Sequence, residues 1–154
     1  DLNPAKVMRW TLAGLGGAVS YWHIDSDGFG TFVNIVCGSK WWCIGKSEKG
    51  FLESDAFLKM DAERADGGQG WDVEGILLTP GTTLIMPPNT PHAVFTVENS
   101  ICKGGFFYSY RSMDRTFAGM VNSTFINSSV TNTDHPVSRT LIRRMVHHLY
   151  NLTI

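Results

Sequence analysis

The sequence predicts a mainly β domain, either a β-sandwich or a small barrel, followed by a helical segment. Up to residue 110, apolar runs of strand length are separated by glycine- and proline-rich turns, and after it the apolar spacing becomes helical. The length of 154 residues fits one domain with a core of its own.

The strand-like part of the chain falls into two groups of four runs. Glycine marks the joints of the first group, and the second group is divided by turn formers such as Pro80-Gly81 and Glu98-Asn99. The pattern therefore predicts about eight strands, at residues 8–15, 18–25, 30–37, 40–45, 73–78, 82–86, 92–97 and 101–110.

The segment between the two groups breaks this rhythm. Its apolar residues lie among many charges, and Gly67, Gly68 and Gly70 mark a loop. We expect an insertion at about residues 47–72, with one short helix, inside a core domain that spans residues 1–111.

The C-terminal part, residues 112–154, has the apolar spacing of two helices. Met113 and Phe117 begin the first pattern, and the second follows Asp134 as a helix cap, with Pro136 in its first turn. We expect this helical segment to pack on the β core.

Charge and composition exclude several classes of partner. A formal net charge of −1 excludes a polyanion-binding surface spread over the whole domain, and no apolar run has the length needed to cross a bilayer. A basic cluster on the last predicted helix is best explained as a solvated face, so we expect no direct nucleic-acid binding; it contains Arg139, Arg143, Arg144, His147 and His148.

The three cysteines are an odd number and lie inside apolar, strand-like runs. They are typical of small buried side chains in a reducing compartment and predict an intracellular protein; they are Cys37, Cys43 and Cys102.

A candidate metal site begins in the second strand-like run. Strand alternation places Tyr21, His23 and Asp25 on one face, and His92 opens a later run after a proline-rich turn. Two imidazoles and one carboxylate are the ligand set of non-haem Fe(II) oxygenases. The alternative is that these strand histidines are only hydrogen-bonded within the fold.

Lys40, at the start of the fourth run, is a further candidate functional residue. A cation that reaches into a barrel is costly unless it meets an anion, such as the far carboxylate of a dicarboxylic acid. The alternative is a lysine that carries its ammonium group out to solvent.

Four ordered motifs resemble one protein family. They are 20–25 (SYWHID), 37–40 (CGSK, with the lysine fifteen residues after Asp25), 91–96 (PHAVFT) and the Gly104-Gly105 pair. They resemble the JmjC Fe(II)/2-oxoglutarate oxygenases, closest to the lysine demethylases that occur with PHD fingers or F-box segments. The resemblance covers about two-thirds of the chain. It implies a double-stranded β-helix, a mainly β jelly-roll with a cupin-like JmjC core, followed by the C-terminal helices.

The resemblance also implies the cofactors and the residues that hold them. Fe(II), 2-oxoglutarate and O2 are the expected cofactors, with His23, Asp25 and His92 as the metal ligands and catalytic centre. Lys40 is expected on the far carboxylate of 2-oxoglutarate.

Two hydroxyl groups complete the implied co-substrate site. Ser20 stands in the place of a threonine that binds the same carboxylate, although strand alternation turns it away from His23. Thr31 is a second candidate on the neighbouring strand. Hydroxylation or demethylation of a protein side chain, with a histone lysine tail as one implied substrate, places the protein in the nucleus more than in the cytoplasm.

This chain departs from the family at two positions. Phe106 stands where an asparagine near the methylated substrate is normal, and Val33 stands where related proteins have a polar or aromatic residue that faces the co-substrate. A phenyl ring offers no amide hydrogen bonds, so lysine demethylation is the doubtful part of the resemblance.

Two rival functions remain open. One is a non-catalytic, cupin-like binding module of a larger chromatin-associated protein, and the other is a cupin isomerase or small-molecule dioxygenase, which would not need Lys40. The histidines of the helical tail, His135, His147 and His148, are not expected to be ligands.

Overall fold

The computed structural model describes residues 8–48, 50, 60, 64, 66–126 and 135–152. It contains eight strands, and each overlaps one of the eight predicted runs. They are β1 (Arg9–Gly14), β2 (Val19–His23), β3 (Gly30–Cys37), β4 (Lys40–Ser47), β5 (Trp71–Leu78), β6 (Thr83–Met86), β7 (His92–Thr96) and β8 (Ser100–Phe107).

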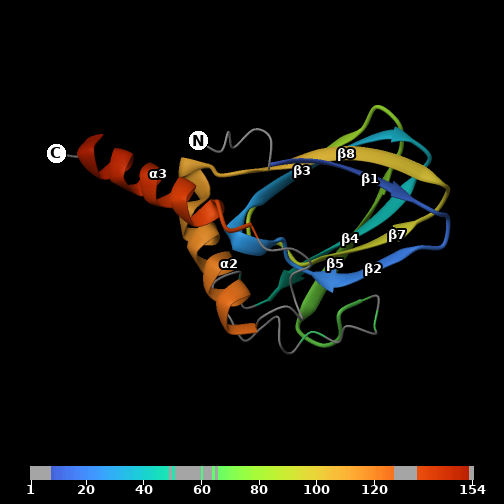
Figure 1. The fold of residues 1–154 in the computed structure, drawn as a ribbon. Helices are drawn as coiled ribbons and strands as arrows, with labels where there is room; N and C mark the ends of the chain where they lie inside the picture. Colours follow the sequence, from blue (N-terminus) through green and yellow to red (C-terminus); the bar gives the residue numbers. More distant parts are fainter. Residues whose placement is uncertain are drawn as a thin grey trace.

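The strands form two antiparallel four-stranded sheets that face each other. One sheet has the order β1-β8-β3-β6 and the other β2-β7-β4-β5, so the chain passes repeatedly between the sheets. Figure 1 shows β1, β3 and β8 above, β2, β4, β5 and β7 below, and the helices at one end. This is a jelly-roll barrel with C-terminal helices, and the predicted fold class is confirmed.

The core lies between the two sheets. Inward side chains of facing strands form one buried cluster, and burying them supplies the main stabilisation of the barrel. Its members are Val33, Ile35, Trp42, Leu78, Met86, Val94 and Cys102.

The prediction that the cysteines are buried is right only for Cys102. Cys43 is half-buried and Cys37 is exposed, and all three thiols are free. The pairing of β3 with β8 is irregular between Ile35 and Cys37, and this irregularity interrupts the alternation on which the prediction depended.

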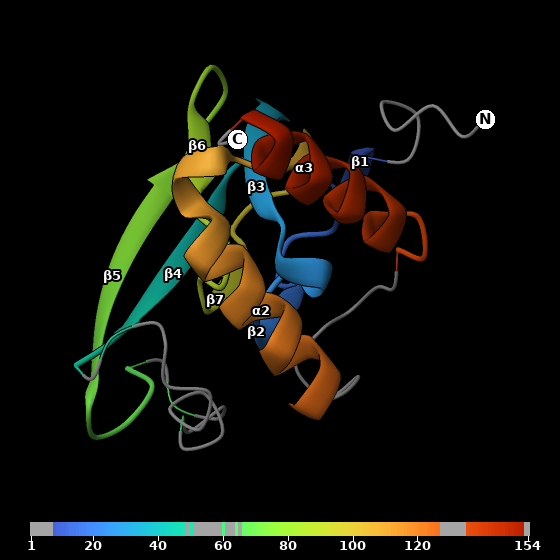
Figure 2. The ribbon, with the colours of Figure 1, turned by 90° about the vertical axis from the view of Figure 1, so that its left-hand side faces the viewer.

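Helix α2 (Met113–Ile126) closes one end of the barrel. It packs on the short 3₁₀ turn Ser26–Gly28, and Figure 2 shows it crossing in front of β2 and β7. Gly28 has φ = 65°, and an added Cβ would lie 2.1 Å from the Thr116 carbonyl oxygen, so only glycine fits under this helix.

Helix α3 (Ser138–Leu152) follows at the same end, and Figure 1 shows it projecting away from the barrel. No helix in the described part of the chain has the length and apolar character needed to span a membrane. The predicted cap Asp134 and most of the predicted insertion at 47–72 lie outside the described residues.

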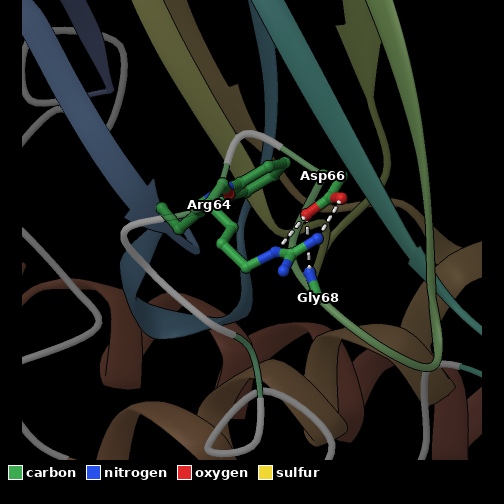
Figure 3. A network of polar contacts seen from close by, with 4 residues as sticks. Arg64, Asp66 and Gly68 are labelled. Atoms are coloured by element: carbon green, nitrogen blue, oxygen red, sulfur yellow. Dashed lines mark hydrogen bonds and ion pairs between the residues drawn. The ribbon is translucent and has the colours of Figure 1, made fainter.

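A polar turn precedes β5 (Figure 3). Arg64 donates two hydrogen bonds to Asp66, of 2.8 and 2.6 Å, and the Gly68 amide donates a third to the same carboxylate, at 3.1 Å. The Arg64 hydrogen bonds, followed by that of Gly68, hold the pKa of Asp66 below its usual range. The Trp22 indole N–H donates to the Arg64 carbonyl at 3.1 Å, which ties this turn to the strand that carries His23.

Candidate functional site

Three predicted ligands meet at the helix-covered end of the barrel. His23 and His92 are direct partners in the pairing of β2 with β7, and Asp25 lies two residues beyond the first histidine. One ligand atom from each residue lies within 4.8 Å of the other two, and the two imidazole centroids are 4.2 Å apart. The three side chains are therefore close enough to share one ion.

Hydrogen bonds to the main chain orient both imidazoles. His23 Nδ1 donates to the Tyr21 carbonyl at 2.7 Å, and His92 Nδ1 donates to the Thr90 carbonyl at 2.9 Å. Because a carbonyl only accepts, each ring carries its proton on Nδ1 and keeps the Nε2 lone pair for a ligand.

Burial favours the neutral form of His23. Its pKa is lowered to about 4, chiefly by desolvation and next by His92, while the Tyr21 carbonyl and Asp25 act in the opposite direction. Near neutral pH His23 is therefore unprotonated, which is the form that binds a metal.

Thr31 acts on the carboxylate of this site. Its hydroxyl donates a hydrogen bond to Asp25 Oδ2, and the Thr31 side chain is buried. Thr31 thus fixes the orientation of Asp25, which leaves the other carboxylate oxygen for an ion.

Lys40 lines the same cavity and pairs with Thr96, at the opposite end of β7 from His92. It is only 3% exposed, its Nζ donates to Thr96 Oγ1 at 2.7 Å, and burial lowers its pKa. The alternative of a lysine that reaches solvent is therefore wrong. The cavity has a volume of about 290 Å³, and Asp25 is the only acidic residue among the described residues that line it. Lys40 thus has no carboxylate partner of its own in the cavity wall.

Ser20 lines this cavity together with His23 and Asp25, contrary to simple alternation. The pairing of β2 with β7 shifts between Ser20 and His23, and this irregularity changes which side chains point inward. Tyr21, predicted on the same face as His23, is 72% exposed and does not line the cavity.

The two departures from the family pattern have different surroundings. Phe106 lines the cavity, with its ring stacked on Phe29 at 5.2 Å and tilted against Trp10 at 6.3 Å. Val33 is fully buried in the core and is not among the residues that line the cavity.

Besides Trp10, His135 is a cavity residue that sequence reasoning missed. It precedes α3 and lines the cavity, whereas His147 and His148 are exposed on that helix. Its main-chain N–H donates to Asp27 Oδ2 at 3.0 Å, and this bond places the ring beside Phe106. The only local signal was Pro136, which indicated that His135 lies in a turn before the helix.

Comparison with known proteins finds relatives with JmjC domains. The chain is 28% identical over 109 residues to JmjC domain-containing histone demethylation protein 1 of Caenorhabditis elegans, covering 70% of this chain and 10% of that protein. It is 30% identical over 122 residues to the protein of the same name from Kluyveromyces lactis, covering 73% and 24%. Lysine-specific demethylase 2A of Xenopus tropicalis is 24% identical over 111 residues, covering 70% and 10%. The chain thus spans between a tenth and a quarter of the length of these relatives.

Among solved structures, a single-residue variant of oxalate decarboxylase from Bacillus subtilis aligns with a TM-score of 0.46 at 16% identity, over 68% of this chain and 22% of that one. The Cupin_2 domain of an XRE family transcriptional regulator from Enterobacter cloacae aligns with a TM-score of 0.41 at 14% identity, over 66% and 80%. No protein-family model matches the chain. The sequence relatives confirm the resemblance that the motifs predicted: the chain is a relative of the JmjC domain-containing histone demethylation proteins.

Proposed function

We propose that this chain is the core of an Fe(II)- and 2-oxoglutarate-dependent dioxygenase of the JmjC type, which hydroxylates or demethylates a protein side chain. One observation carries the proposal. Two imidazole nitrogens and a carboxylate converge at one end of a cavity whose other end holds a buried ammonium group. A cavity with no use for a metal and an organic anion would gain nothing from burying these groups.

The residues present fit the proposed cofactors. Two neutral imidazoles and one carboxylate are a donor set suited to Fe(II), with coordination positions left open. Lys40, buried without a carboxylate in the cavity wall, fits the far carboxylate of 2-oxoglutarate, and the Ser20 hydroxyl lines the same cavity. In this proposal Thr31 serves the metal through Asp25 and does not contact the co-substrate.

The protein's own contribution is orientation and the exclusion of water. When bound, Fe(II) supplies the redox chemistry in which 2-oxoglutarate and O2 become succinate and CO2 and a substrate C–H bond becomes C–OH. The main-chain hydrogen bonds of His23 and His92 engage Nδ1 and leave each Nε2 free, so these nitrogens would hold the ion together with Asp25, which Thr31 orients. Lys40 fixes the direction of the keto acid, and the apolar walls, which include Trp42 and Val94, keep water away.

The names of the relatives support a protein substrate, a histone tail among the candidates, and a nuclear location. If the hydroxylated carbon is a methyl group on nitrogen, the hydroxymethyl product breaks down to the demethylated amine and formaldehyde. Phe106 replaces the amide that would hold a methylammonium group by hydrogen bonds, so we favour hydroxylation of another side chain over lysine demethylation.

Metal analysis and succinate release test this function. The wild-type protein should bind one Mn(II), a redox-silent substitute for Fe(II), and His23→Ala and His92→Ala should lose it. His147→Ala, at an exposed position on α3, is the matched control and should keep the ion. With Fe(II), ascorbate and a panel of peptides, the wild-type protein should release succinate above the level of the His92→Ala variant.

Three outcomes separate the alternatives. Undiminished metal in folded His23→Ala and His92→Ala proteins would overturn the assignment of the ligands. Metal binding without any affinity for 2-oxoglutarate would favour the cupin isomerase or small-molecule dioxygenase. Binding of both without succinate release on any substrate would favour the non-catalytic module.

A further inference from the structure

The cavity wall around Phe106 carries two ring nitrogens without partners. Trp10 Nε1 and His135 Nε2 are both buried, and neither has a hydrogen-bond partner among the described residues. Both residues line the cavity that holds the metal ligands. A buried polar atom without a partner is unfavourable, so a ligand that pairs with it is bound more tightly.

Phe106 lies in contact with both of these rings. Its centroid is 6.3 Å from that of Trp10 and 5.0 Å from that of His135, which meets it edge-on. Phe106 is paired with Thr31, and Thr31 holds Asp25, so this wall adjoins the metal end of the cavity and not the Lys40 end. A group held here would face the metal ligands.

The two nitrogens differ in chemistry. The indole N–H of Trp10 can only donate, whereas Nε2 of a neutral imidazole can accept. A carboxamide offers a carbonyl oxygen to the first and an N–H to the second. A quaternary ammonium group offers neither a donor nor an acceptor.

The charge balance of the cavity favours a neutral group. With the proposed function in place, the dication and Lys40 are balanced by Asp25 and the dianion 2-oxoglutarate. Asp25 is the only acid among the described lining residues, so no carboxylate is left to compensate a cationic substrate.

We propose that Trp10 and His135 form a subsite for an uncharged carboxamide group of the substrate, beside Phe106 and at the metal end of the cavity. This inference rests on the proposed function. It makes the two residues substrate-binding and specificity-determining groups of the same site.

Nuclear magnetic resonance of the ring nitrogens tests the subsite directly. The chain has five tryptophans and five histidines, so the signals are few, and Trp10→Phe and His135→Gln each remove one and thereby assign it. The protein is loaded with Zn(II), which is diamagnetic, and 2-oxoglutarate, and is then titrated with acetamide or with tetramethylammonium.

Acetamide should move the Trp10 and His135 signals together along one saturable curve, and tetramethylammonium should leave both in place. The signal of Trp41, which is 42% exposed on β4, is the control and should not move with either probe. In His135→Leu, the Trp10 signal should follow acetamide with an affinity weakened by about 2- to 10-fold, as expected for one hydrogen bond.

Two results would overturn the subsite: no shift of Trp10 and His135 with acetamide, or an equal shift with tetramethylammonium. The wild-type titration decides this even if His135→Leu does not fold. The His23 and His92 signals report separately on Zn(II). If they do not move when Zn(II) is added, the proposed function itself fails, and the subsite fails with it.

Discussion

Replacement of Lys40 by methionine should change fold stability and co-substrate affinity in opposite directions. Lys40 is 3% exposed, and its ammonium group has a hydrogen bond to Thr96. Burying an ammonium costs several kcal/mol, whereas a hydrogen bond to a charged group returns only about 1.5–3 kcal/mol. A methionine of similar length removes the larger cost, so the metal-free variant should be more stable than the wild type, by about 1 kcal/mol or more.

The same change removes the proposed partner of a carboxylate. Truncating one member of a buried charge pair costs about 2–5 kcal/mol, which weakens binding by about 30-fold to several thousand-fold. Urea unfolding of the metal-free protein measures the first effect, and calorimetry of 2-oxoglutarate with the Mn(II)-loaded protein measures the second. Lys46→Met, at an exposed position on the same strand, should change neither.

Two results would refute this reasoning. Equal affinity of wild type and Lys40→Met for 2-oxoglutarate would remove Lys40 from the co-substrate site. Strong destabilisation of metal-free Lys40→Met would show that the ammonium group is a structural element of the barrel.

Three further predictions concern the same cavity. The pKa of His23 falls from 6.5 to about 4 on folding, so between these pH values the unfolded chain binds more protons than the folded one. Urea unfolding of the metal-free protein should therefore show full stability above pH 6.5 and a loss of at most about 3 kcal/mol toward pH 4. His23→Gln should remove this pH-dependent component. With Phe106 in place, mass spectrometry should find little or no loss of methyl groups from trimethyl-lysine peptides, and efficient loss would show that this residue does not decide the substrate. In Gly14→Ala the new Cβ would lie 3.1 Å from Lys40 Nζ and 3.2 Å from Thr96 Oγ1, so the ammonium group would have to shift. Calorimetry should then show weaker 2-oxoglutarate binding with unchanged Mn(II) binding. A change confined to Mn(II) binding would contradict this.

The strands could be predicted from the sequence because the lengths of the apolar runs and the positions of the turn-forming residues indicate the same boundaries. Most of the apolar runs of strand length end close to a glycine, proline or asparagine, and each run overlaps a strand of the barrel. The convergence of His23, Asp25 and His92 was also predictable. Local strand rules do not say that β2 pairs with β7, but the spacing of the family motifs implies it.

The errors arise where backbone irregularity or distant packing decides. Ser20 and Tyr21 were assigned to the wrong faces because strand alternation assumes regular pairing, and the pairing shifts between Ser20 and His23. The burial of Cys37 was predicted wrongly for the same reason, because the pairing of β3 with β8 is irregular at the end of β3. His135 was missed because only the folded chain brings the residue before α3 to Phe106 and Asp27.

The position of β2 would give a bound metal ion a mechanical role as well. β2 is an edge strand, joined to the sheet only through β7, and its pairing breaks between Ser20 and His23. An ion shared by His23 and His92 would cross-link β2 to β7 beyond that break, at the end of β2 where the regular pairing has stopped. The amides of β2 should then exchange with deuterated solvent early in the metal-free protein and late in the loaded one, so that the opening of a single strand would report whether the site is filled.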